Sequence, residues 1–575
     1  MSTPVPYAFE RDRLLGTLFE VGPNECRAVL RRDSVAEGRW LHGAKFPGGR
    51  VGEFVVIECS EHGIFGKITH ITLPERERRN FEDKPEDIHP VATVQLLTTF
   101  SPASAEASGG IVAHPLVGNG LFSANPRLVK ALAESGRSPG KKQHVVFQIG
   151  SLPDGDDVSV ALTPERLFGR HCAVLGTTGG GKSYTIAHLA EEAMKHRSKI
   201  LLLDATGEFH TLKGPVSHFH LGGVPLHGET TVVLPHTELT ESDLFALFTP
   251  SPGVQAPKLR AAFKSLKLAG LEATLAPQGC IVKAGQKRAA YDAAFVKHAA
   301  SLQLPKAVFD IAKLNLQIDA ECVWPTGFLP NRQPDTTAWG GPDDAARGHC
   351  VSLMARIETL TAGAELACVF KPAAAVPSIL TKLDEFLANP AARIMRVSLR
   401  DLSFAYGTRE IVANALGRHL MELARAGKFT GSVPLVVMLD EAHQFLNKRV
   451  GDEVSSTSLD AFELIAKEGR KHWLTICMAT QRPRDIPEGV LSQMGTLIVH
   501  RLTNSLDRTV VERAAGQLDQ SAAEFLPTLA PGEAAIIGID FPIPLTVQIS
   551  KPTNHPSSTG PMFQEKWANP PPAPA

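Results

Sequence analysis

The amino-acid sequence predicts an α/β protein with a parallel sheet at its core, a small β-barrel at its N-terminus and an inserted helical region. Three observations lead to this prediction. Residues 1–100 alternate short apolar stretches with turns, as small all-β units do. From about residue 166 apolar runs alternate with helical segments, which is typical of a parallel sheet. Residues 226–390 interrupt that alternation with mainly helical sequence and Pro-Gly breaks.

The expected core strands are short apolar runs, as strands buried on both faces of a sheet must be. They are residues 171–175, 199–205, 392–399, 434–440, 474–480 and 496–502. The expected order along the chain is a barrel (1–100), a connector (101–165), a core in two pieces (166–225 and 391–550), the helical insertion (226–390) and a flexible Pro-rich tail (551–575).

Composition is that of a soluble globular protein, with 43% hydrophobic and 21% charged residues in a chain of 575. The net charge of −1 gives no global signal for nucleic acid, so a DNA-binding surface would have to be local. Eight scattered cysteines without a CxxC pair indicate reduced thiols. The N-terminus lacks a signal-peptide core, and no apolar run approaches the roughly 20 residues of a membrane span. We therefore expect a cytoplasmic protein.

The stretch GTTGGGKSYT (176–185) matches G-x-x-x-x-G-K-[ST] and lies between a predicted strand and a predicted helix, as that motif requires. Its glycines let main-chain N–H groups turn toward an anion, and the helix N-terminus adds partial positive charge. Lys182 can reach terminal phosphates, and the Ser183 hydroxyl can bind Mg²⁺. The alternative is a flexible glycine-rich loop. Candidate nucleotide-binding residues are Gly176, Thr177, Thr178, Gly179, Gly180, Gly181, Lys182, Ser183 and Tyr184.

The run PLVVMLDEAHQFL (434–446) is an apolar strand that ends in two acids. In a chain with a phosphate loop, Asp440 is the candidate Mg²⁺ ligand and Glu441 the group that polarises the attacking water. The alternative is an acidic pair that caps the following helix. The chain has neither the NKxD motif of a GTPase nor the LSGGQ motif of an ABC ATPase, and no acceptor site of a kinase is recognisable. An ATPase that attacks with water is favoured.

Two further strand ends carry polar residues. Gln481 follows the strand LTICMAT, where it could sense the γ-phosphate; ordinary strand-end polarity is the alternative. DATGEF (204–209) places Asp204 and Glu208 after the second core strand, beside the phosphate loop in a parallel sheet.

A basic cluster, Lys467, Arg470 and Lys471, lies in AKEGRKHW (466–473). It is either an exposed helix end, where cations are favourable, or the source of an arginine finger for a neighbouring subunit. Such a finger contributes about 10³–10⁵ in rate.

The motifs GTTGGGKSYT, DATGEF, MLDEAHQFL, AKEGRKHW, ATQRP and GTLIVHRLTN occur in this order. Together they resemble the HerA family of hexameric DNA-translocating ATPases, within the HerA–FtsK group of P-loop NTPases. The resemblance covers about residues 166–550, and more weakly the N-terminal barrel. It implies a RecA-like core assembled as a ring, with ATP at subunit interfaces and double-stranded DNA through the pore.

By motif position, the resemblance assigns phosphate and Mg²⁺ binding to Lys182 and Ser183, and the sensor role to Gln481. It gives Asp440 and Glu441 the metal and water roles.

The resemblance also makes Arg470 the trans finger and Arg170 a nucleotide-contacting arginine. Lys467 departs from the R-E-G-R-K form of the family, and DATGEF departs from D-P-H-G-E-Y while keeping the acid, the Gly and the aromatic.

Pore contacts could come from Lys213, Lys448 and Arg449, on loops that leave strand ends. Their contacts would be to phosphates and independent of DNA sequence. Solvated surface residues are an equal alternative.

These observations favour an ATP-driven, ring-forming DNA translocase that works with an effector, because the chain has no nuclease motif of its own. The resemblance suggests two settings: DNA-end processing beside a NurA-like nuclease, or anti-phage (antiviral) defence with a Sir2-like NADase or another nuclease. The divergent insertion and tail favour the defence setting. The alternative is a nucleotide-responsive hexameric scaffold that activates an effector without processive translocation.

Overall fold

The computed structural model describes residues 7–31, 40–41, 44–45, 48–74, 89–135, 145–153, 158–403, 405–446, 448–450, 457–515, 520–539, 541, 543–557 and 563–568. The chain divides into two compact units. The first comprises Met1–Ser198, Glu208–Gly214 and Thr475–Ala575, and the second comprises Lys199–Gly207 and Pro215–Leu474.

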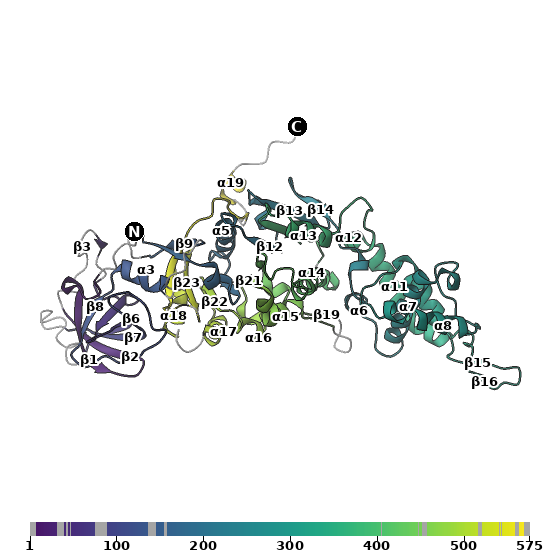
Figure 1. Ribbon diagram of the computed structural model, residues 1–575, viewed down its shortest axis with the longest axis horizontal. Helices are drawn as coiled ribbons and strands as arrows, with labels where there is room; N and C mark the ends of the chain where they lie inside the picture. Colours follow the sequence, from purple (N-terminus) through teal and green to yellow (C-terminus); the bar gives the residue numbers. More distant parts are fainter. Residues whose placement is uncertain are drawn as a thin grey trace. The chain divides into compact units, whose positions relative to one another are not determined.

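The first unit begins with a closed antiparallel barrel, drawn in purple in Figure 1. Its strands are β1 (Leu14–Val21), β2 (Glu25–Leu30), β7 (Val91–Phe100), β6 (Gly63–Thr72), β5 (Phe54–Glu58) and β8 (Gly120–Ser123), in that order around the barrel. Leu15, Leu18, Val55 and Ile57 are among the buried residues that fill it. The barrel predicted from the short alternating strands is confirmed. Its closing strand, β8, comes from the stretch interpreted as a connector.

The first unit also contains a mixed sheet. Its strand order is β10 (Ser159–Leu162), β9 (Phe147–Ser151), β24 (Leu545–Ile549), β23 (Glu533–Gly538), β22 (Thr496–Val499), β11 (Cys172–Leu175) and β21 (Leu474–Thr480). Strand β11 is parallel to both β21 and β22, and the remaining neighbours are antiparallel. The unit's helices include α3 (Pro126–Glu134), α4 (Pro164–Phe168), α5 (Lys182–Met194), α16 (Glu488–Leu491), α17 (Ser505–Ala515), α18 (Gln520–Phe525) and α19 (Phe563–Ala568).

The second unit is built on a parallel sheet. Its strand order is β18 (Leu435–Leu439), β12 (Lys199–Asp204), β17 (Ile394–Ser398), β13 (Val216–Leu221) and β14 (Thr230–Val232). Every residue of β12 and β17 is buried, which explains why both strands are rich in apolar residues. The long helix α14 (Thr408–Arg425) packs against α15 (Ala461–Glu468), and the hairpin β19 (Lys448–Val450)–β20 (Thr457–Leu459) precedes α15.

Helices dominate the stretch between β14 and β17, as the sequence predicts; α7, α8 and α11 gather beside the small hairpin β15–β16 (Figure 1). They are α6 (Glu241–Phe248), α7 (Gln255–Leu271), α8 (Ala289–Lys297), α9 (Ala299–Leu302), α10 (Leu314–Glu321), α11 (Asp344–Ala362), α12 (Ala367–Phe370) and α13 (Ile379–Ala388), and the hairpin is Gly327–Phe328 with Pro334–Asp335. Side-chain caps mark the starts of some of these helices, and Thr240 and Asp243 form a reciprocal capping box at α6.

Within the described ranges, no helix combines the length and the apolar character needed to cross a bilayer.

Candidate nucleotide-binding site

The glycine loop, residues 176–181, joins the end of strand β11 to helix α5 in the first unit. Gly179 and Gly181 have φ values of 74° and 116°, which residues with a side chain rarely adopt. A Cβ at Gly179 would meet no atom within 4 Å, so the tip of the loop faces open space. Gly181 is the N-cap of α5 and supplies no side-chain hydrogen bond. The N-cap residue therefore does not compete with an anion at this helix N-terminus.

Lys182 is the first residue of α5 and is buried. Its Nζ donates a hydrogen bond to the Thr177 carbonyl oxygen, 3.0 Å away. The Thr177 main-chain N and hydroxyl both donate to the Arg501 carbonyl oxygen, at 3.1 and 3.2 Å. The loop thus folds back over its own lysine and is tied to the chain after β22.

Gln481 lies beside the loop, where the sensor interpretation needs it. It follows strand β21, the parallel neighbour of β11. The Thr178 hydroxyl donates a hydrogen bond to Gln481 Oε1. Because the two strands are paired in parallel, their carboxyl ends lie at the same edge of the sheet.

His500, at the end of β22, forms the floor of the glycine loop. Its main-chain N donates to the Leu175 carbonyl at 2.7 Å, and its Nδ1 donates to the Glu533 carbonyl at 2.8 Å. Nε2 is then the acceptor for the Thr185 hydroxyl of α5, at 2.8 Å. The imidazole is fully buried and connects α5 to strand β23.

The position of His500 also explains two of the loop glycines. A Cβ at Gly176 would lie 2.7 Å from the His500 Cβ, and one at Gly181 would lie 3.0 Å from the His500 Cε1. Burial, with a smaller contribution from the positive charge of Lys182, lowers the pKa of His500 to about 4. The floor of the loop is therefore uncharged at neutral pH.

Sequence reasoning missed His500, although GTLIVHRLTN was used as a family motif. The available signal was a single histidine directly after a continuous apolar strand. That signal does not say which loop the histidine supports, because the pairing of β22 with β11 is set by the fold.

Ser183 and Tyr184 occupy the first turn of α5, both partly exposed. Arg170 precedes β11, so it lies at the opposite end of that strand from the glycine loop. Its carbonyl accepts a hydrogen bond from the Gly495 N at 2.9 Å. Glu208 opens the short 3-10 helix η3 (Glu208–Thr211) in the first unit, and Lys213 is exposed just after it.

In the second unit, Asp440 and Glu441 follow strand β18. Asp440 is buried, and its Oδ2 accepts a hydrogen bond from the Thr206 hydroxyl at 3.2 Å. Glu441 adopts a left-handed conformation, with φ 47° and ψ 49°, which is costly for a residue with a side chain. Its Oε2 lies 3.2 Å from His443 Nδ1. The chain therefore turns sharply between the two acids, and His443, missed in the sequence despite lying in the same motif, contacts the second.

Asp204, at the end of β12, has its carboxylate engaged within the protein. Oδ2 accepts from Arg396 Nε and Oδ1 from the Gly207 N, both at 2.7 Å. Arg396 is fully buried in β17, and its Nη1 lies 2.6 Å from Glu229 Oε1. Asp204 holds the turn after β12 and neutralises a buried arginine.

The basic cluster lies at the end of α15 and in η10 (Gly469–His472), and its three cations are exposed. Lys467 pairs with Glu463 one turn earlier, at 2.5 Å. Within the part of the chain that the structure describes, the Arg470 guanidinium makes no hydrogen bond or ion pair. Lys448 and Arg449 lie in β19, and their side chains fall outside the described structure.

The residues of each unit fit part of a magnesium nucleotide. The first unit supplies main-chain donors, a lysine and a serine hydroxyl, which suit phosphates. The second supplies carboxylate oxygens after β18, which are the ligands that Mg²⁺ prefers.

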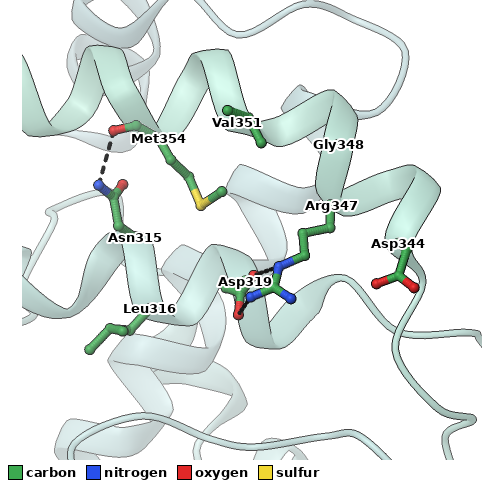
Figure 2. Close-up of a pocket in the computed structure, with 8 residues that line it drawn as sticks. All are labelled: Asn315, Leu316, Asp319, Asp344, Arg347, Gly348, Val351 and Met354. Carbon is green, nitrogen blue, oxygen red and sulfur yellow. Dashed lines mark hydrogen bonds and ion pairs between the residues drawn. The ribbon is translucent and has the colours of Figure 1, made fainter.

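A different pocket, of about 490 Å³, lies between α10 and α11 in the insertion (Figure 2). An exposed ion pair between Arg347 Nε and Asp319 Oδ1, at 2.6 Å, forms part of its wall. The side chains of Leu316 and Val351 also line it. No residue of the nucleotide motifs is among its lining residues.

Two family models match the chain. The model described as "Helicase HerA, central domain" matches residues 147–278, and the model described as "Helicase HerA-like C-terminal" matches residues 421–561.

Archaeal relatives align over much of the chain. The "Probable DNA double-strand break repair helicase HerA" of Methanocaldococcus jannaschii is 23% identical over 427 residues, covering 70% of this chain and 76% of the relative. The "DNA double-strand break repair helicase HerA" of Saccharolobus solfataricus is 23% identical over 529 residues, covering 87% of each chain.

Among solved structures, the bacterial conjugative coupling protein TrwBdeltaN70 aligns with a TM-score of 0.41 and 12% identity, over 72% of this chain and 92% of that one. VirB4 of Thermoanaerobacter pseudethanolicus aligns with a TM-score of 0.41 and 15% identity, over 72% of this chain and 98% of that one.

Proposed function

The chain belongs to the HerA family of P-loop ATPases, and from this premise we propose that it is an ATP-driven DNA translocase that acts as a ring. The observation that carries the proposal is the glycine loop. Its tip faces open space, its helix N-terminus has no side-chain cap, and its lysine and a strand-end glutamine lie beside it. This arrangement suits a terminal phosphate and the water that attacks it.

Each motif residue then has a chemical task. With a magnesium nucleotide bound, Lys182 would bond the terminal phosphates, and Ser183 and Asp440 are each candidate ligands of Mg²⁺, whose charge would offset that of the phosphates. Glu441 accepts the proton of the attacking water, and Gln481 hydrogen-bonds that water or the γ-phosphate. His443 orients the Glu441 carboxylate through their 3.2 Å contact.

Arg470 is the candidate trans finger of this ring. It is exposed on η10, whereas Lys467 is held by Glu463. A guanidinium without a partner among the described residues is available for a neighbour's phosphates. The finger would therefore be Arg470 and not the lysine at the position where the family often carries arginine.

The wider assembly follows from the same premise. Double-stranded DNA would pass through a hexameric pore and contact basic residues through its phosphates, so binding weakens with salt. The chain would act with an effector: a NurA-like nuclease, a Sir2-like NADase or another nuclease, in DNA-end processing or antiviral defence. The alternative is a hexameric scaffold in which nucleotide turnover switches an effector without translocation; the near-neutral net charge is compatible with it.

The test is ATP hydrolysis by the full chain with and without duplex DNA. Lys182→Ala and Glu441→Gln should each lower the rate by at least about 10², while Lys264→Ala, an exposed lysine of α7, should not. DNA stimulation together with ATP-dependent displacement of a roadblock supports the translocase. Hydrolysis that is lost in both variants but indifferent to DNA supports the scaffold. Hydrolysis that survives both variants would refute the assignment of the site.

Mixing experiments test the finger. Arg470→Ala and Lys182→Ala proteins should both be inactive alone. If the finger acts in trans, mixed rings recover activity, because some interfaces pair an intact loop with an intact arginine. Lys467→Ala serves as the matched control and should retain most activity. The absence of recovery in rings shown to be mixed would contradict a trans role.

A further inference from the structure

Residues 551–557, which follow strand β24, lie against helix α5; we call this segment the C-terminal strap. Glu191, in the third turn of α5, holds it. Glu191 Oε2 accepts a hydrogen bond from the Thr553 N at 2.8 Å, and Oε1 accepts from the main-chain and side-chain nitrogens of Asn554 at 2.6 and 2.7 Å. Pro552 and Pro556 are buried. A single carboxylate thus fixes the strap to the helix of the phosphate loop.

The strap is also fixed on its other side, by the short helix η3. The Thr211 hydroxyl donates to the His555 carbonyl at 2.7 Å, and the Ser557 N donates to the Glu208 carbonyl at 2.9 Å. The main chain on both sides of His555 is therefore anchored. Anchoring of this kind sets where the His555 side chain lies.

His555 is brought to Tyr184. Their ring centroids are 5.4 Å apart, with the ring planes at 58°. Tyr184 lies on the first turn of α5, directly after Lys182 and Ser183. His555 is exposed and Tyr184 is partly exposed, so aromatic surface remains accessible beside the glycine loop.

We propose that Tyr184 and His555 form the base subsite of the nucleotide site, an aromatic platform on which the base of a bound nucleoside di- or triphosphate stacks. The inference rests on the proposed function, because it requires phosphates in the glycine loop. Such a loop holds the phosphates at the start of α5, and the sugar and base must leave from there. Tyr184 lies on that first turn of α5, and His555 of the strap lies against it.

The aromatic platform predicts which ligands the site should distinguish. Stacking is tolerant of base identity, because every base has a π-face. Asn554 carries the one side-chain amide of residues 551–557, and its nitrogen is already bound to Glu191. The subsite should therefore distinguish a nucleotide from an inorganic phosphate chain strongly, and adenine from guanine weakly.

Calorimetric titration of the full chain with Mg-ADP and with Mg-pyrophosphate tests this subsite. The wild-type protein should bind ADP more tightly than pyrophosphate. Tyr184→Ala and His555→Ala should each weaken ADP binding about tenfold and leave pyrophosphate binding unchanged. Tyr184→Phe, which keeps the ring, should restore ADP binding. Tyr7→Ala, an exposed tyrosine of the first unit, is the matched control and should change neither ligand.

Glu191→Ala tests whether ADP binding needs the strap to hold His555 in position, because the variant keeps the His555 ring. It should release the strap and weaken ADP binding as His555→Ala does, with pyrophosphate binding again unchanged and the folded state confirmed by thermal unfolding. Equal losses for both ligands in the ring variants would overturn the base subsite. So would a wild-type protein that does not distinguish ADP from pyrophosphate. If the wild-type protein binds neither ligand, the proposed function fails, and the subsite with it.

Discussion

The glycine loop after β11 and the turn after β12 occupy equivalent places in the fold, but they differ in their electrostatics. Each follows a fully buried parallel strand, and each contains glycine with positive φ. The loop rests on the neutral imidazole of His500. The turn after β12 is closed by Asp204, whose charge is matched by Arg396 inside the protein. A neutral floor leaves the positive groups of the loop for a ligand, whereas the internal ion pair leaves little charge to recognise one.

The largest effect should come from breaking the ion pair. Arg396→Met should lower the free energy of unfolding by about 3–5 kcal/mol, because it leaves Asp204 and Glu229 buried without their partner. Urea unfolding of the full chain measures it. Arg347→Met removes a comparable but exposed pair with Asp319 and should cost no more than about 1 kcal/mol. If both variants lose the same free energy of unfolding, the buried ion pairs of Arg396 stabilise the fold no more than the exposed pair of Arg347 does.

At the glycine loop, the second prediction concerns pH: the free energy of unfolding should depend on the protonation of His500. The pKa of His500 falls from 6.5 to about 4 on folding, so the unfolded chain binds more protons between these values. The neutral His500 side chain contributes about 3 kcal/mol to the free energy of unfolding. This contribution is fully present above pH 6.5 and is lost as the pH falls toward 4. His500→Gln should flatten this part of the profile of unfolding free energy against pH. If unfolding free energy depends on pH as steeply in the variant as in the wild-type protein, His500 does not have the lowered pKa.

Two alanine substitutions should isolate the contact between loop and floor. Gly179→Ala and Gly181→Ala both place a side chain at positive φ, which costs about 1–2 kcal/mol. Only at Gly181 would the new Cβ also meet the His500 ring, at 3.0 Å. Gly181→Ala should therefore cost more in unfolding free energy and weaken ADP binding further. If the two variants behave alike, the imidazole does not constrain the loop.

The smallest effect should come from Thr206→Val, in a comparison of one hydroxyl from each region. Thr185→Val leaves His500 Nε2 buried without its donor, at a cost of about 1–3 kcal/mol, whereas Thr206→Val removes a more exposed hydrogen bond to Asp440 and should cost about 1 kcal/mol. Matched Thr→Ser variants should keep both bonds. Chemical denaturation of the four proteins gives the comparison, and a reversed order would contradict it.

Much of the fold was accessible from the sequence because local patterns encode it. The apolar runs at 199–205, 392–399 and 434–440 became β12, β17 and β18, and the short alternating stretches became the barrel. The glycine loop was recognisable because its residue types and its helix are adjacent in the chain. Gln481 was expected near the γ-phosphate because it directly follows an apolar strand, and its bond to Thr178 places it beside the loop.

The sequence by itself therefore determined the elements, the phosphate loop and the acidic strand end, all of which depend on neighbours a few residues apart. Only the tertiary structure decided what supports them. His500 bonds Thr185 across 315 positions, Arg396 meets Asp204 across 192, and the strap meets Glu191 across 363. Such contacts depend on which strands pair and where the chain returns, and hydrophobic periodicity records burial but not partners. The sequence predicts Asp204 as a candidate nucleotide-binding residue, and only the structure shows the buried arginine that its carboxylate contacts.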